Sequence, residues 1–194
     1  FVVQMLFRNY YFNGHEASLV HAIRSIDKMI QGGIYDPLAG GFARYSTDAQ
    51  WQVPHFEKML YDNALFISLI AEAYQITQKK SYKKVIEQTL HFLNTELSNE
   101  AGGYYSALDA DSEGVEGKFY TWTFEEIKSL VDASIFKEFC AYYQITEAGN
   151  WEHTNILWTQ EPMEKGMNEA FEQARQALFQ ARAKKIRHAL DYKI

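Results

Sequence analysis

The hydrophobic residues of the chain recur mainly at steps of three and four positions, which is the spacing of one buried helical face. The first clear run covers residues 16–30. Asn13 is the predicted N-cap of this helix, and Gly32 and Gly33 are its predicted end, because these residue types favour the two helix termini. The apolar positions of the run are Leu19, Val20, Ile23, Ile26 and Ile30.

A second helix is predicted to begin at Pro54, since proline suits the first position of a helix. It takes in the stretch VPHFEKMLYDN of residues 53–63, with apolar positions at Phe56, Met59, Leu60, Ala64, Ile67, Ile70 and Tyr74. Ser81 is the predicted N-cap of a third helix that ends near Leu97. Further helices are predicted near residues 123–131, 133–144 and 166–187.

The pattern therefore predicts an all-α fold of antiparallel helical hairpins, with strands limited to small β-hairpins. Two β-prone runs, 103–107 and 118–122, flank an acidic loop with glycines and predict one such hairpin. Short stretches also recur: AYQIT at 73–77 as YYQIT at 142–146, and GGIYD at 32–36 as GGYYS at 102–106. Either these echoes are chance, or the chain repeats a helical hairpin that stacks into a solenoid or closes into a toroid.

Composition excludes several classes of protein. With 47% hydrophobic and 15% aromatic residues, the chain has enough apolar material for a packed core, so disorder is not expected. The formal net charge is −6 and Lys and Arg form only short pairs, which speaks against a nucleic-acid partner. No apolar run is long enough to span a membrane. We expect a soluble, cytoplasmic protein in which Cys140 is a buried, inert thiol.

Three stretches carry a resemblance to a known family. They are GGIYDPLAGGFARYSTDAQWQVPHFEKMLYDNA from residue 32, GGYYSALDADSEGVEGKFYTWTFEEI from residue 102 and ARAKKIRHALDYKI from residue 181. Together they resemble successive motifs of the spermatogenesis-associated protein 20, or YyaL-like, family. Three features depart from the family pattern: Pro37 and Ala39 in the first motif, Asp191-Tyr192-Lys193 in the last, and no thioredoxin-like Cys-x-x-Cys.

The resemblance implies an architecture. Members of the family carry a thioredoxin-like domain followed by an (α/α)6 toroid similar to the six-hairpin glycosidases and sugar epimerases. Residues 1–194 would then be a single domain, an incomplete toroid without the thioredoxin-like domain, and a chain that opens on Phe1 is expected to be cut from something longer. Half a toroid would expose apolar helix faces near the chain ends and favour self-association.

The stretch around His55 is the strongest candidate for chemistry. In a helix that starts at Pro54, His55 and Asp62 would lie two turns apart on one face, and Glu57 would sit at the positive end of the helix dipole. Histidine is the usual proton-transfer group near neutral pH. The alternatives are that Glu57 only stabilises the helix start and that His55 is a core histidine bonded to a backbone carbonyl.

The walls of the expected pocket come from aromatic and polar residues near these motifs. Aromatic rings can stack on sugar rings, and an arginine can bind a carboxylate. The residues that we assign to ligand binding are Arg44, Tyr45, Trp51, Asn63, Tyr105 and Trp122. The alternative is that the aromatic residues only pin the loops onto the helix ends.

The acidic loop DADSEGVEG contributes two more candidate catalytic acids, Asp109 and Asp111. It matches the first half of a calcium-binding loop, but Tyr120 stands where a bidentate Glu is needed. We therefore expect no metal and no cofactor. Paired carboxylates could instead share the acid and base roles of glycoside hydrolysis.

Three functional hypotheses remain open at this stage. The first is a carbohydrate-active enzyme, hydrolase- or epimerase-like, acting on a carbohydrate or another small polar ligand at the mouth of the toroid. The second is a non-catalytic binding module that accompanies a thioredoxin-like domain. The third is an interaction scaffold of the solenoid type. Convergent acids with shifted pKa values favour the first, and separately paired acids favour the second.

Overall fold

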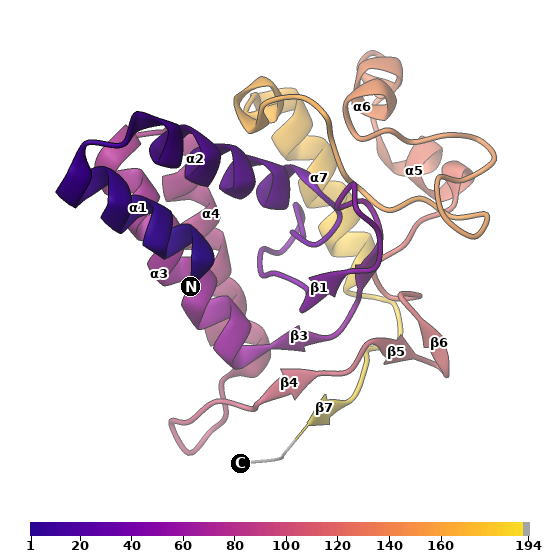
Figure 1. Ribbon diagram of the computed structural model, residues 1–194. Coiled ribbons are helices and arrows are strands. Elements are labelled where there is room, and N and C mark those ends of the chain that lie inside the picture. The colour runs from indigo at the N-terminus through magenta and orange to yellow at the C-terminus, as the bar shows by residue number, and fades with distance from the viewer. Residues whose placement is uncertain (192–194) are drawn as a thin grey trace.

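The computed structural model describes residues 1–191, and two antiparallel helical hairpins form one end of it (Figure 1). Helix α1 (Val2–Asn13) pairs with α2 (Glu16–Gln31), and α3 (Leu60–Thr77) pairs with α4 (Lys80–Phe92). Both hairpins contribute to one apolar core, in which Phe7, Ala22, Ile70 and Val85 are buried.

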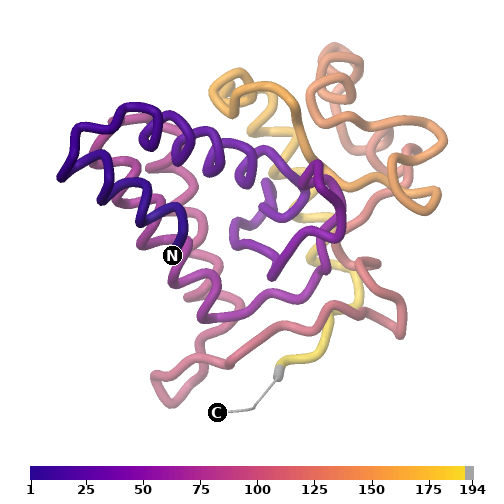
Figure 2. Tube along the Cα trace, viewed as in Figure 1, coloured from indigo at the N-terminus to yellow at the C-terminus, as the bar shows by residue number. Residues whose placement is uncertain are grey.

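The second half of the chain adds shorter helices and a second core. A five-residue π-helix (Leu93–Leu97) extends α4, and α5 (Phe124–Leu130), α6 (Phe136–Tyr142), a 3₁₀ helix (Met163–Gly166) and α7 (Glu169–Arg182) follow. Trp122, Phe139 and Phe171 are buried in this second core. Figure 2 shows that the chain, after α7, returns towards the short strands.

Short antiparallel strands occupy the lower half of the view in Figure 1. Strand β1 (Tyr45–Ser46) pairs with β2 (Pro54–His55), and β5 (Asp111–Ser112) pairs with β6 (Val115–Glu116). The third sheet has β4 (Ala107–Leu108) between β3 (Lys58–Met59) and β7 (Leu190–Asp191). It therefore joins three segments that are far apart in the sequence.

The prediction of a mostly helical chain is confirmed, and most of the helices lie where they were expected. Two caps differ. The residue before α2 is His15 instead of Asn13, and its side chain makes no capping bond. Helix α4 begins at Lys80, so Ser81 lies inside it, buried and bonded to Glu164. The helix-capping prediction at these two sites was wrong, whereas α5 has a capping box between Thr123 and Glu126.

The prediction of a helix beginning at Pro54 was wrong. Residues 54–55 pair with β1, residues 58–59 pair with β4, and α3 begins only at Leu60. Burial alternates along this segment: Pro54, Phe56 and Lys58 are buried, while His55 and Glu57 are partly exposed. This is the period of two of an extended chain. Cross-strand pairing satisfies the backbone here and overrides the local helix signals.

The β-hairpin was predicted in the right region with the wrong strands. Instead of residues 103–107 pairing with 118–122, β4 pairs with β3 and β7, and the acidic loop forms its own tight hairpin. Glu113 and Gly114 are its two turn residues and both have positive φ, 54° and 75°. Such a turn matches the twist of the flanking strands and favours glycine. Trp122 instead pairs with Asn155.

Apolar surface is exposed near the chain ends; the incomplete toroid from which this exposure was predicted stays a proposal. On α1 the exposed residues are Phe1, Val2, Met5, Tyr11 and Phe12, and Ile186 is exposed near the other end. Among residues 1–191, no helix has the length and apolar character to cross a membrane. Cys140 is half-buried, and burial raises the pKa of its thiol.

We expect Asn63→Ala to lower the free energy of unfolding by about 2–3 kcal/mol, because it leaves buried backbone groups without partners. The Asn63 side chain is fully buried, accepts from the backbone N–H of Phe42 at 2.7 Å, and donates to the carbonyls of Phe42 at 3.0 Å and Met59 at 2.8 Å. Chemical denaturation measures the change. Asn13→Ala, at an exposed helix end, is the control and should change stability little. Equal losses in both variants would contradict this account.

Candidate functional site

His55 and Tyr45 face each other across the β1–β2 pair. Their rings are stacked, with centroids 5.0 Å apart and an angle of 25° between the planes. The ladder continues on either side, because the N–H of Arg44 donates to the carbonyl of Glu57 at 2.8 Å and the N–H of Thr47 donates to the carbonyl of Val53 at 2.8 Å. Two adjacent extended segments thus hold Arg44, Tyr45, His55 and Glu57 in fixed relative positions.

Two carboxylates lie beside the imidazole of His55. The Nδ1 atom lies 2.7 Å from a carboxylate oxygen of Glu116, and Nε2 lies 3.8 Å from a carboxylate oxygen of Glu57. Glu57 also accepts a hydrogen bond from the Arg44 guanidinium at 3.0 Å. The side chains of these four residues are between 25% and 45% exposed, so a ligand can reach them. We call Arg44, Tyr45, His55, Glu57, Asp62 and Glu116 the His55 site.

Asp62 completes the site from the first turn of α3. One of its carboxylate oxygens is buried and has no hydrogen-bond partner among residues 1–191. Burial raises the pKa of Asp62, the nearby charge of Arg44 opposes that change, and the charge of Glu57 adds to it. Asp62 thus lies within electrostatic reach of Arg44 and Glu57, and a carboxyl group with a raised pKa is a type of group that acid–base catalysis uses.

Asp48 holds the loop between β1 and β2 in place. Its carboxylate accepts hydrogen bonds from the backbone N–H groups of Gln50 at 2.6 Å and Val53 at 2.6 Å, and from the Ser46 hydroxyl at 3.2 Å. Burial alone would raise the pKa of Asp48, but these hydrogen bonds outweigh it and lower the pKa. Asp48 is therefore a positioning residue for the loop that carries Tyr45 and His55.

The acidic loop meets the His55 site through a residue that the sequence analysis did not select. Asp109 and Asp111 are both exposed, and the carboxylate of Asp109 accepts the N–H of Asp111 at 3.1 Å. Asp111 lies opposite Glu116 in the β5–β6 hairpin, and Glu116 makes the contact with His55. In the described part of the chain, no group of three or more His, Cys, Asp or Glu residues could hold a metal ion.

Four of the predicted ligand-binding residues contribute to packing. Trp122 is buried in the second core, Trp51 packs against the first core, and Tyr105 packs against a third apolar cluster that contains Phe92. Asn63 is buried beneath the loop that contains Phe42. Of the aromatic residues assigned to the pocket, Tyr45 is the one that lies in the His55 site.

On the buried side of the segment that carries His55 and Glu57 lies a cluster of three charged side chains. They are Asp36, Lys58 and Arg182, and we call this cluster the charged clasp. The Asp36 carboxylate accepts from Lys58 at 2.9 Å and from Arg182 at 3.0 and 2.9 Å. It also accepts the backbone N–H groups of Leu38 and Ala39. Asp36 is 8% exposed, and each of the two cations is 3% exposed.

Aromatic rings cover the cations of the charged clasp. The Lys58 ammonium lies 4.7 Å from the ring centres of both Phe92 and Tyr120, and the Arg182 guanidinium lies 5.5 Å from that of Tyr120. Burial alone would raise the pKa of Asp36, but the charges of Arg182 and Lys58 outweigh it and hold that pKa well below its usual range. Burial lowers the pKa of Lys58 despite the attraction of Asp36.

The sequence analysis missed Lys58 because a helix would have placed it on the surface. In the extended segment, Lys58 points to the buried side with Phe56, opposite to His55 and Glu57. The nearby loop also depends on glycine. At Gly41, whose φ is 81°, a Cβ atom would lie 2.5 Å from the ring of Phe92. The close packing of this loop against α4 brings the carbonyl of Gly40 to 3.1 Å from the Lys58 ammonium.

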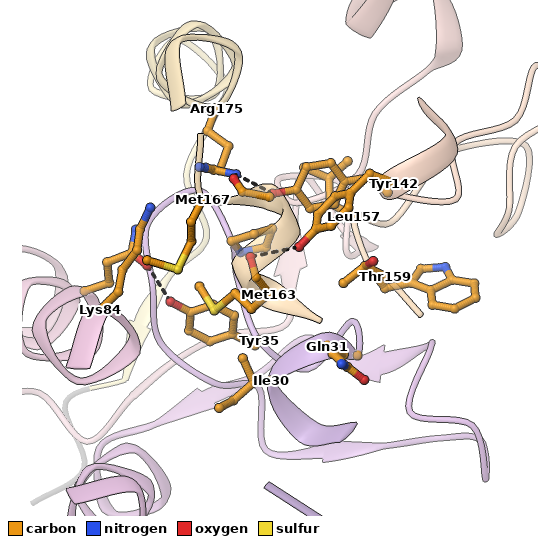
Figure 3. Close-up of a pocket in the computed structure, with 16 residues that line it drawn as sticks. Ile30, Gln31, Tyr35, Lys84, Tyr142, Leu157, Thr159, Met163, Met167 and Arg175 are labelled. Atoms are coloured by element: carbon orange, nitrogen blue, oxygen red, sulfur yellow. Dashed lines mark hydrogen bonds between the residues drawn. The ribbon is translucent and has the colours of Figure 1, made fainter. Parts of the chain in front are cut away.

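A separate cavity lies between the end of α2, α4 and α7 (Figure 3). The hydroxyl of Tyr35 donates to Gln88 at 2.7 Å, and Arg175 donates to the hydroxyl of Tyr143 at 3.0 Å. Met163 and Met167 supply apolar surface. The cavity holds only about 30 Å³, which is room for a water molecule or two. It is too small for a sugar.

The fold and site define a mostly helical protein, built of antiparallel helix pairs, with a polar site on short strands. The chain is 38% identical to human spermatogenesis-associated protein 20 over 144 residues, or 66% of this chain and 18% of that protein. The mouse protein of the same name is 37% identical over 144 residues, which are again 66% of this chain and 18% of that protein. An uncharacterised Caenorhabditis elegans protein is 34% identical over 148 residues, or 69% of this chain and 20% of that protein.

These relationships confirm that the chain belongs to the spermatogenesis-associated protein 20 family. The chain spans only about a fifth of the length of these curated relatives. No protein-family model matches it. The family resemblance inferred from the three motifs is thus confirmed, whereas the toroid remains a proposal.

We expect Asp36→Asn to lower the free energy of unfolding at pH 7 by about 3–5 kcal/mol, because it leaves two buried cations without their anion. The pKa of Asp36 is lower in the folded than in the unfolded chain. Its contribution to stability is therefore complete above the unfolded value of about 3.9 and is lost as the pH falls below it.

Denaturation between pH 7 and pH 2 tests both parts of this expectation. The difference between wild type and Asp36→Asn should shrink as the pH falls below about 4. Asp109→Asn, which changes an exposed carboxylate, is the matched control and should stay close to wild type at pH 7. If, at neutral pH, Asp36→Asn loses no more unfolding free energy relative to the wild type than Asp109→Asn does, the role of the clasp is contradicted.

Proposed function

We propose that the His55 site binds a small polar ligand, of the carbohydrate class, and transfers protons at it. One observation carries the proposal: the imidazole of His55 is stacked on Tyr45 and lies beside the carboxylates of Glu57 and Glu116. A partly exposed tyrosine ring offers an apolar face for a sugar ring. The surrounding carboxylates and the guanidinium of Arg44 offer hydrogen bonds to hydroxyl groups.

His55 and Asp62 are the proton-transfer groups in this proposal. Burial raises the pKa of Asp62, and we assign to Asp62 the role of proton donor to a leaving oxygen. His55 can accept a proton, and Glu116 at 2.7 Å orients its ring and stabilises the imidazolium that results. Glu57 and Arg44 position the ligand. This combination supports hydrolase- or epimerase-like chemistry, in line with the toroid that the family resemblance implies.

A non-catalytic binding module is the second candidate, and a different observation favours it. Glu57 is already paired with Arg44, and Glu116 with His55, so these two carboxylates are satisfied without a ligand. Paired acids of this kind bind hydroxyl groups without performing chemistry. In that case the module would present its ligand to another part of a longer protein.

Calorimetric titration with a panel of monosaccharides and short oligosaccharides tests the proposal. We expect Tyr45→Ala to weaken binding about tenfold, which corresponds to about 1.4 kcal/mol of lost stacking. Tyr104→Ala is the matched control, since the exposed fractions of Tyr45 and Tyr104 are 49% and 47%. No binding of any sugar, or equal losses in both variants, would contradict the proposal.

Product analysis by chromatography separates the two candidates. If the site is catalytic, Asp62→Asn should abolish conversion of a bound sugar while preserving its binding, because asparagine keeps the shape but cannot donate the proton. If a sugar binds to the wild type and is recovered unchanged, the binding module is the correct description. Thermal melting of Asp62→Asn controls for a loss of folding.

A further inference from the structure

The charged clasp contains one more positive charge than its acid can neutralise. Lys58 and Arg182 share the single carboxylate of Asp36, so the three buried side chains have a formal net charge of +1. A further acid whose charge acts on Lys58, Glu96, accepts a hydrogen bond from Arg187 at 2.8 Å. This second pair is neutral and does not compensate the excess charge.

The excess charge is costly in its present surroundings. Lys58 has two hydrogen-bond acceptors, Asp36 and the carbonyl of Gly40, for three donor positions. Burial, and the like charge of Arg182, lower the pKa of Lys58. The faces of Phe92 and Tyr120 attract the ammonium, but a ring face is a weaker partner than an anion.

A small cavity borders the clasp on the side of the segment that follows α7. It holds about 20 Å³, and Phe92 and Leu108 are among its apolar lining residues. Its polar lining comprises His188, the cations Lys58, Arg182 and Arg187 and the acids Asp36 and Glu96, so the lining keeps a formal excess of one positive charge. That volume accepts one or two atoms of the size of a water oxygen. The occupant must therefore be small.

His188 supplies an unused polar atom next to this cavity. Its ring is stacked on Tyr120, and its buried Nδ1 atom has no hydrogen-bond partner among residues 1–191. Burial and the neighbouring cations Lys58, Arg187 and Arg182 lower the pKa of His188 to about 4, although exposed Asp109 opposes this. At neutral pH the ring is therefore neutral and can donate one N–H from Nδ1.

We propose that this cavity is a binding site for a small monovalent anion of the size of chloride. The ammonium of Lys58 and the guanidinium of Arg182 attract the anion, and His188 donates a hydrogen bond to it. One bound negative charge would neutralise the clasp. This chemistry and size fit a free halide, whereas a carboxylate or an oxyanion such as phosphate has three or more heavy atoms and is too large for the space.

Thermal melting with sodium chloride added in place of sodium gluconate, at constant ionic strength, tests for the anion. We expect the melting temperature to rise and to saturate with chloride, because a ligand that binds only the folded state stabilises it. Lys58→Met should abolish this dependence, since it removes the excess charge and keeps an unbranched side chain against the rings. Lys185→Met is the matched control: Lys185 also lies over a ring, that of Trp122, and it should keep the chloride response.

Crystals soaked in sodium bromide give a second readout that does not depend on folding of a variant. An anomalous peak in the cavity beside Lys58 and Arg182 would support the proposal, and an empty cavity would overturn it. Equal chloride responses in wild type and Lys58→Met would also overturn it.

Discussion

The Asp36 carboxylate, bound by Lys58 and Arg182, is the contact on which the arrangement of this chain depends. Asp36 lies in the loop after α2, Lys58 in β3, and Arg182 at the end of α7, 146 residues further along the chain from Asp36. Because all three side chains are buried, removing the Asp36 carboxylate leaves both cations without compensation in a medium of low polarity. The clasp therefore joins the loop after α2, strand β3 and the end of α7.

The extended segment of residues 54–59, which contributes Lys58 to the clasp, also contributes His55 and Glu57 to the candidate site. In an extended chain, alternate residues point to opposite sides. Lys58 points to the buried side and reaches the clasp. Its neighbour Glu57, and His55 two residues before Glu57, point to the opposite side, where the candidate site lies. If the strand pairing of residues 54–59 shifted by one residue, Lys58 would be exposed and His55 would be buried. The burial of Lys58 in the clasp and the exposure of His55 therefore require the same strand register.

Sequence reasoning recovered the helices better than the site. The periodicity of residues 16–30 identifies α2, because that helix packs one apolar face on the core. Around Pro54 the local signals favoured a helix, and strand pairing with residues distant in sequence decided otherwise. The pairing of β1 with β2 nevertheless brings together four residues that the sequence analysis had assigned to one site, Arg44, Tyr45, His55 and Glu57. Their role in that site stays a prediction. Glu116 and Arg182 depend on long-range contacts, which periodicity does not report.

Chemical labelling followed by mass spectrometry tests the alternation of this segment most directly. We predict that an amine-acylating reagent modifies Lys58 at least about a hundredfold more slowly than Lys83, because Lys58 reacts only when the clasp opens. The Lys58 side chain is 3% exposed, and that of Lys83 is 60% exposed. In the same folded protein, diethyl pyrocarbonate should modify His55 readily. Labelling of Lys58 as fast as Lys83, or a protected His55, would contradict the account.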